Sequence, residues 1–66
     1  MQISIRSARV NKEMTQAEAA KKLGVDRKTL ASWEKGKTMP SAVQIPLICT
    51  LYEVNYDNIR WNGKAQ

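Results

Sequence analysis

The residues of this chain best suited to chemistry are polar side chains at the start of a short predicted helix. Asp26 opens this helix and is followed by an arginine, a lysine and a threonine, with a serine three positions after the threonine. Long polar side chains at the exposed N-terminal end of a helix are typical of a helix that enters the major groove of DNA. We therefore predict that the base-contacting residues are Arg27, Lys28, Thr29 and Ser32.

Each of these four residues also has a structural interpretation. Arg27 and Lys28 can be solvated charges, but the helix dipole is positive at this end and disfavours them there. A positive charge that costs stability without a structural benefit favours a functional role. Thr29 can contact a thymine methyl group or form a hydrogen bond within its own helix, and Ser32 has similar alternatives. For these two hydroxyl residues both interpretations remain open.

A second short helix, predicted over residues 16–23, precedes the polar one. Thr15 is a good N-cap, and Glu18 stands three residues later, which makes a capping box. Gly24 lies where a helix needs a residue in the left-handed conformation in order to stop. The inward face of this helix is expected to carry Ala19, Ala20 and Leu23.

The polar helix is predicted to run from its N-cap Asp26 to Gly36. Leu30 and Trp33 are three residues apart, so both face inward, while Arg27 and Lys28 fall on the outer side. The small residues of the preceding helix allow the two helices to approach closely at a steep angle. The first helix can then lie across a DNA backbone while the second enters the groove.

Two further helices are predicted on either side of this pair. The first covers about residues 3–12 and places Ile5, Ala8 and Arg9 on one side. Ser41 could cap the other, but Pro46 would then remove a backbone hydrogen bond inside it. Either that helix is kinked, or its regular part begins near the proline, which suits a first turn. We favour the later start.

The end of the chain is predicted to be less regular. Residues 57–59 are expected to form a final turn, and Arg60 and Trp61 an extended segment. Trp61 can cover the edge of the core or contact a partner subunit. Residues 62–66 are expected to be a disordered tail. The sequence thus predicts one compact all-α domain of four to five helices over residues 1–61.

The charge of the chain is unevenly distributed along its length. Eleven Lys and Arg against six Asp and Glu give a net charge of +5. Residues 1–40 contain nine basic and four acidic residues, whereas residues 41–66 contain two of each. The whole excess therefore lies on the part that contains the helix pair, which favours a polyanionic partner over plain solubilising charge.

The composition argues against several other classes of protein. Without histidine and with only Cys49, an ordinary zinc site is excluded, and we predict neither metal nor cofactor. Cys49 is best explained as a small buried apolar residue. No acid–base pair or nucleophile with a partner is evident, so we do not expect an enzyme. No apolar run approaches the roughly 20 residues of a membrane span, and residues 1–6 have no hydrophobic signal-peptide core, so a soluble cytoplasmic protein is expected.

Taken in order, these motifs resemble those of the XRE family of helix-turn-helix DNA-binding domains, the class of phage repressors and Cro proteins. The similarity covers residues 5–59, and the opening Ile-Arg-Ser-Ala-Arg-Val looks most like small phage or prophage regulators of Gram-positive bacteria. The matching residues are Ile5, Arg9, Met14, Thr15, Gln16, Ala20, Leu23, Gly24, Val25, Leu30, Trp33, Glu34, Lys35, Gly36, Pro40, Ser41, Ile45, Ile48 and Val54.

The resemblance implies a lambda-repressor-like fold and a role for each matching position. Arg9 and Glu34 would form a partly buried salt bridge between the first and third helices. Gln16 would contact a phosphate and could also reach a base, and the four residues named at the outset would meet base edges. The DNA backbone would be contacted by Thr15, Gln16, Lys35, Lys37 and Thr38.

The partner implied is double-stranded operator DNA in a bacterial nucleoid, read by a transcriptional regulator. Because one domain reads only a short half-site, a homodimer on a palindromic site is expected. The alternative is a protein-interaction module on the same fold, such as an antirepressor or an antitoxin-type adaptor. The excess of basic residues in residues 1–40, which contain the helix pair, argues against this alternative.

Three positions depart from the pattern of the family. Ala19 stands where a leucine is frequent and leaves less core volume, which Trp33 or Met14 could offset. Glu13 replaces a common glycine, so the first turn could differ. Pro46 interrupts the fourth helix. We expect these departures to affect the last helices more than the reading helix.

Overall fold

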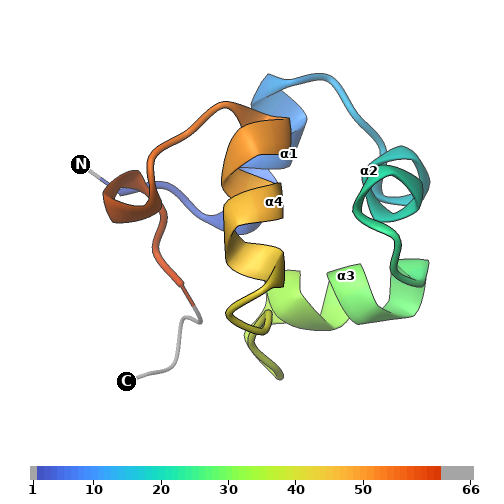
Figure 1. Ribbon diagram of the computed structural model, residues 1–66. Coiled ribbons are helices and arrows are strands. Elements are labelled where there is room, and N and C mark those ends of the chain that lie inside the picture. Colours follow the sequence, from blue (N-terminus) through green and yellow to red (C-terminus); the bar gives the residue numbers. More distant parts are fainter. Residues whose placement is uncertain (1, 62–66) are drawn as a thin grey trace.

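The computed structural model of the chain describes residues 2–61, so the predicted tail at residues 62–66 lies outside the described residues. Figure 1 shows an all-α arrangement in which α3 runs along the bottom of the view, with α2 and α4 above it. The predicted fold class is confirmed. The elements of the described part are α1 (Ile5–Asn11), α2 (Gln16–Leu23), α3 (Arg27–Lys35), α4 (Gln44–Tyr52) and the 3-10 turn η1 (Tyr56–Asn58).

The core takes side chains from all four helices and from the segment after η1. Leu30 and Trp33 of α3 are buried, as their spacing predicted. Three of the core residues are alanines, which let the helix backbones approach closely. The buried apolar residues are Ile5, Ala8, Ala19, Ala20, Leu23, Leu30, Trp33, Ile48, Tyr52 and Ile59.

The predicted start of the first helix at residue 3 is wrong. α1 begins at Ile5 because the Ser4 hydroxyl caps it and accepts a hydrogen bond from the Ser7 amide at 3.0 Å. Ile3 instead forms a parallel bridge with Ile59 near the other end of the described chain. Its amide donates to the Asn58 carbonyl at 2.9 Å, and its carbonyl accepts from the Arg60 amide at 2.8 Å. A contact so distant in sequence leaves no local signal.

The boundaries of α2 and α3 are confirmed. The capping box of Thr15 and Glu18 is present at the start of α2. Gly24 ends the helix in the left-handed conformation, with φ 76°, and the Val25 amide bonds back to the Ala20 carbonyl at 3.0 Å. Asp26 is the N-cap of α3, but its side chain makes no capping hydrogen bond. Gly36 closes α3 with φ 80°.

The fourth helix follows the later of the two predicted starts. α4 begins at Gln44, so Pro46 lies in its first turn, where its missing N–H breaks no helical hydrogen bond. The N-cap is Val43, which has no capping side chain. Ser41 contributes through its carbonyl, which accepts from the Gln44 amide at 2.9 Å and from the Ile45 amide at 3.1 Å.

The last described residues fold back onto the core. The final turn lies one residue earlier than predicted, at Tyr56–Asn58, because Ile59 is extended and paired with Ile3. Trp61 lies in a turn and not in an extended segment. Its indole N–H donates to the Tyr56 carbonyl at 3.1 Å, and its ring stacks on Tyr56 with 5.5 Å between centroids. Trp61 therefore covers the edge of the core, one of its two predicted roles.

The loop between α1 and α2 contains a left-handed residue that is not a glycine. Glu13 has φ 58° at the position where the family commonly has glycine. The left-handed conformation costs a residue with a β-carbon about 1–2 kcal/mol. The departure at Glu13 noted in the sequence therefore carries local backbone strain.

Candidate nucleic-acid interface

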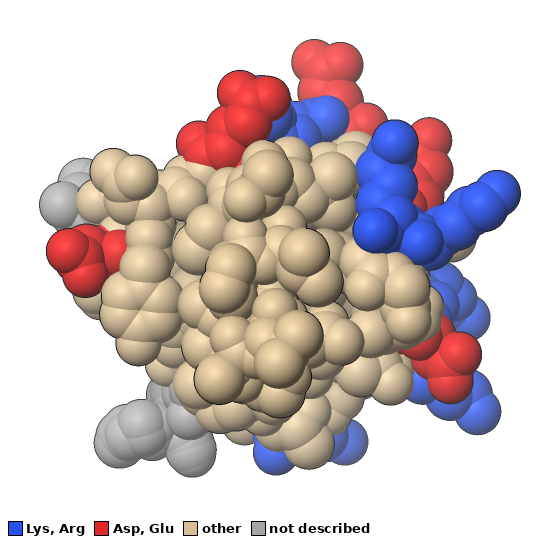
Figure 2. All heavy atoms as spheres, viewed as in Figure 1, with Lys and Arg blue, Asp and Glu red and all other residues tan. Residues whose placement is uncertain are grey.

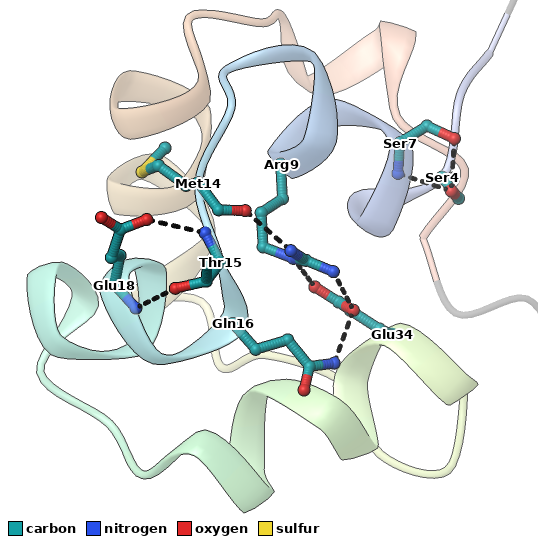
Figure 3. Close-up of polar contacts among 8 residues, drawn as sticks. All are labelled: Ser4, Ser7, Arg9, Met14, Thr15, Gln16, Glu18 and Glu34. Atoms are coloured by element: carbon teal, nitrogen blue, oxygen red, sulfur yellow. Dashed lines mark hydrogen bonds and ion pairs between the residues drawn. The ribbon is translucent and has the colours of Figure 1, made fainter.

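A buried ion pair joins α1 to α3 beneath the predicted reading surface. The Arg9 guanidinium donates two hydrogen bonds to the Glu34 carboxylate, from Nε to Oε2 at 2.7 Å and from Nη2 to Oε1 at 3.2 Å (Figure 3). The two side chains are only 9% and 4% exposed. This is the pair that the family resemblance implied. Charge-assisted bidentate pairs of this kind fix direction as well as distance, so α1 and α3 are held in one relative orientation.

The same guanidinium also holds the loop that leads into α2. Its Nη1 donates to the Met14 carbonyl at 2.8 Å. Met14 itself packs against the core directly before the N-cap of α2. The hydrogen bond to Glu34 is the largest influence on Arg9, and it raises the pKa of the guanidinium above its usual value. Arg9 therefore stays charged and connects α1 to α3 and to the loop that leads into α2.

Gln16 adds α2 to the network. Its Nε2 donates to Glu34 Oε1 at 3.0 Å, and its amide oxygen points away from that carboxylate (Figure 3). The Glu34 carboxylate thus accepts hydrogen bonds from side chains of both α1 and α2. The sequence motif predicted a phosphate contact for Gln16 and missed this link, since 18 positions separate the two residues.

Tyr52 brings α4 against the same charges. Burial raises the pKa of Tyr52 to about 12, the negative charge of Glu34 adds to this, and Arg9 opposes it. Its hydroxyl is buried and has no hydrogen-bond partner among the residues that the structure describes. Tyr52 therefore lies close to the charges of the network through packing and not through a hydrogen bond.

The predicted contact residues lie on α3, at the start of α2 and in the loop after α3. Arg27 and Lys28 are exposed in the first turn of α3, with no ion pair between either of them and any described acidic residue. Thr29 and Ser32 are half-buried, and Ser32 Oγ accepts a hydrogen bond from the Thr38 hydroxyl at 3.0 Å. Gln16 is also half-buried, whereas the exposed backbone-contact candidates are Thr15, Lys35, Lys37 and Thr38.

Positive charge gathers on one side of the molecule. Figure 2 shows most Lys and Arg side chains at the right and lower edges of the view, over α2 and α3, while the centre of this face is uncharged. Lys21 and Lys22 are exposed in the last turn of α2, close in sequence to Arg27 and Lys28. The sequence motif did not single out this lysine pair. In the sequence, these two lysines contributed only to the excess of basic residues counted over residues 1–40.

A comparison with protein families agrees with this geometry. The model of a helix-turn-helix family matches residues 5–59, the same stretch that carries the resemblance in the sequence. The chain belongs to the XRE-type helix-turn-helix family. No match was found among curated proteins or among solved structures.

Membership of the helix-turn-helix family implies DNA as the partner, and domains of this family are typically not enzymes. The helix-turn-helix itself is α2, the turn at Gly24 and α3. None of the described helices is long and apolar enough to span a membrane. The phage or Gram-positive origin remains a prediction from the sequence.

The first prediction concerns the Glu34 carboxylate. Glu34→Leu should lower the free energy of unfolding by about 3 kcal/mol or more, because it leaves the buried Arg9 charge unpaired. Urea denaturation followed by circular dichroism measures the loss. The double variant Arg9→Met/Glu34→Leu removes both charges and should recover much of the stability. A loss below about 1 kcal/mol in Glu34→Leu would show that the pair does not organise the fold.

The second prediction uses the raised pKa of Tyr52. The unfolded tyrosine ionises near its usual pKa of 10 and the folded one near 12, so stability should fall as the pH rises through this interval. The loss attributable to Tyr52 is about 2–3 kcal/mol. Tyr52→Phe should remove this part of the alkaline loss in urea titrations at pH 9 to 12. At pH 7 it should leave stability within about 1 kcal/mol. Parallel alkaline profiles for both proteins would contradict the assignment.

Proposed function

We propose that this chain is a repressor- or Cro-like transcriptional regulator of a phage or prophage, which binds operator DNA with α3 in the major groove. The observation that carries the proposal is the position of Arg27 and Lys28. Both are exposed in the first turn of α3, and the buried Glu34 network fixes the other end of the same helix. A rigid helix with long cationic side chains at its free end is what base readout requires.

The base contacts follow from the chemistry of each side chain. The Arg27 guanidinium suits the O6 and N7 atoms of guanine, and Lys28 suits either a guanine or a phosphate. Thr29 can place its methyl group against that of a thymine. Ser32 already accepts a hydrogen bond from Thr38, so its own hydroxyl proton is available to a base acceptor.

The backbone contacts would flank α3 on both sides. Lys35 and Lys37 are exposed at the end of α3 and just beyond it, where they can neutralise phosphates. At the start of α2, Gln16 gives one amide N–H to Glu34 and retains a second one for a phosphate. Free backbone N–H groups at that helix start add to the same contact. Thr15 contributes a hydroxyl donor, because its oxygen accepts from the Glu18 amide and its proton stays available. The Thr38 hydroxyl would have to turn from Ser32 to donate to a phosphate.

A dimer on a palindromic operator accounts for specificity. One α3 reads only a few base pairs, and a second copy on the next half-site doubles the sequence that is read. Half-sites one helical turn apart are separated by about 34 Å. The described part of one copy measures 27 × 22 × 20 Å, so two copies side by side fit this spacing.

The third prediction separates base readout from backbone contact. In a selection from random duplexes, the chain should enrich a palindromic sequence. On that sequence Arg27→Ala should lose about 1–3 kcal/mol of discrimination at one base pair of each half-site. Lys37→Ala should weaken binding to all duplexes and reduce the slope of log K against log salt by about one.

Fluorescence anisotropy with matched and single-mismatch duplexes at several salt concentrations measures both effects. Equal affinities of both variants and the unaltered chain would overturn the groove assignment. Failure to retain any duplex at low salt would favour the protein-interaction module instead.

A further inference from the structure

The loop after α3 is hydrogen-bonded to Ser32 at two atoms. The Lys37 amide donates to the Ser32 carbonyl at 3.0 Å, as part of the left-handed turn at Gly36 that closes the helix. The Thr38 hydroxyl donates to Ser32 Oγ, also at 3.0 Å. Both the backbone and the side chain of Ser32 are therefore held by residues that lie just beyond the end of α3.

The side-chain bond differs from the one that a serine inside a helix usually makes. Such a hydroxyl can donate to the carbonyl four residues earlier in its own helix, which turns it away from any partner. Among the described residues, the Ser32 hydroxyl is bonded to Thr38 instead. Since the Ser32 oxygen accepts this bond, the serine keeps its own proton for another acceptor.

The same bond occupies the one hydroxyl proton of Thr38. A contact to the DNA backbone would need that proton, because a phosphate oxygen accepts hydrogen bonds and does not donate them. Thr38 can therefore either hold Ser32 or contact a phosphate, but it cannot do both at once. The phosphate contact implied for Thr38 would leave the Ser32 oxygen without its donor.

We propose that Thr38 is a positioning residue for Ser32 and not a contact to the DNA backbone. This rests on the proposed function, because it requires Ser32 to read a base. With Thr38 donating to its oxygen, Ser32 meets the DNA as a hydrogen-bond donor. The atom that it contacts is then an acceptor in the major groove: O6 or N7 of guanine, N7 of adenine or O4 of thymine.

The loop also connects this base contact to a phosphate contact. Lys37 is exposed and can neutralise a phosphate through its side chain, while its own amide holds the Ser32 carbonyl. A phosphate bound by Lys37 would thus steady the loop that orients Ser32. A side chain that is ordered before DNA arrives costs less to immobilise in the complex.

Four substitutions that keep the net charge test this role. Thr38→Val removes the donor but keeps the shape of the side chain, and Thr38→Ser restores the hydroxyl. Ser32→Ala removes the proposed base contact itself. The matched control is Thr50→Val, the same chemical change at an exposed position of α4 outside the predicted contacts.

Binding of each chain is measured on the selected duplex and on duplexes with one base pair exchanged. The base pair read by Ser32 is the one at which Ser32→Ala loses discrimination. There the unaltered chain, Thr38→Ser and Thr50→Val should discriminate about three- to tenfold. Thr38→Val should fall to the level of Ser32→Ala and keep its affinity for the exchanged duplexes. Combining Thr38→Val with Ser32→Ala should bring no further loss.

Two results of this measurement would overturn the proposal. If Thr38→Val weakens binding to every duplex equally and keeps the discrimination, Thr38 is a backbone contact. If Ser32→Ala discriminates at every base pair as the unaltered chain does, Ser32 reads no base and Thr38 has nothing to position.

A measurement on the free chain separates this role from the proposed function. NMR couplings between the α and β protons of Ser32 report whether its side chain keeps one rotamer. The unaltered chain and Thr38→Ser should show one rotamer, and Thr38→Val an average over several. Equal couplings in the unaltered chain and Thr38→Val would overturn the proposal. A rotamer that depends on Thr38, in a chain that selects no duplex, would refute the proposed function and leave the positioning of Ser32 standing.

Discussion

The Glu34 carboxylate is the interaction on which the arrangement of the helices depends. It is almost fully buried on α3 and accepts hydrogen bonds from Arg9 of α1 and Gln16 of α2. The same Arg9 side chain reaches the loop between these helices through the Met14 carbonyl. Removing either charge leaves the other buried and unpaired, which is strongly destabilising. The relative orientation of α1, α2 and α3 therefore depends on this one ion pair. A domain of 66 residues has little other core to replace this constraint.

The network also explains how a small domain can hold a reading helix firmly and still expose it. Glu34 lies in the last turn of α3, and Leu30 and Trp33 anchor its inner side in the core. The first turn, with Arg27 and Lys28, is free of these contacts and projects its charges outward. Stability and the proposed DNA recognition thus use different ends and sides of one helix of nine residues. The exterior is divided too, since basic side chains gather over α2 and α3 while α4 contains no charged residue (Figure 2).

Local signals in the sequence were sufficient for most of the fold. The Thr15–Glu18 capping box, the left-handed Gly24 and Gly36 and the proline in a first turn each act within a few residues, so their outcome is readable in advance. The start of α1 could not be predicted from local signals, because Ile3 pairs with Ile59 at the other end of the described chain. The Gln16–Glu34 hydrogen bond is equally distant in sequence, and the Arg9–Glu34 pair was predictable only through the family resemblance. Contacts with bases depend on a partner outside the chain, so they remain predictions.

The most direct test of the account is a map of which amides and side chains touch DNA. NMR spectra of the labelled chain with a duplex obtained by selection should show nuclear Overhauser contacts between base protons of the major groove and side chains in residues 27–32. Shifts at residues 15, 16 and 35–38 should mark the phosphate contacts. Contacts between base protons and any other helix, with α3 unperturbed, would contradict the claim that α3 is the reading helix.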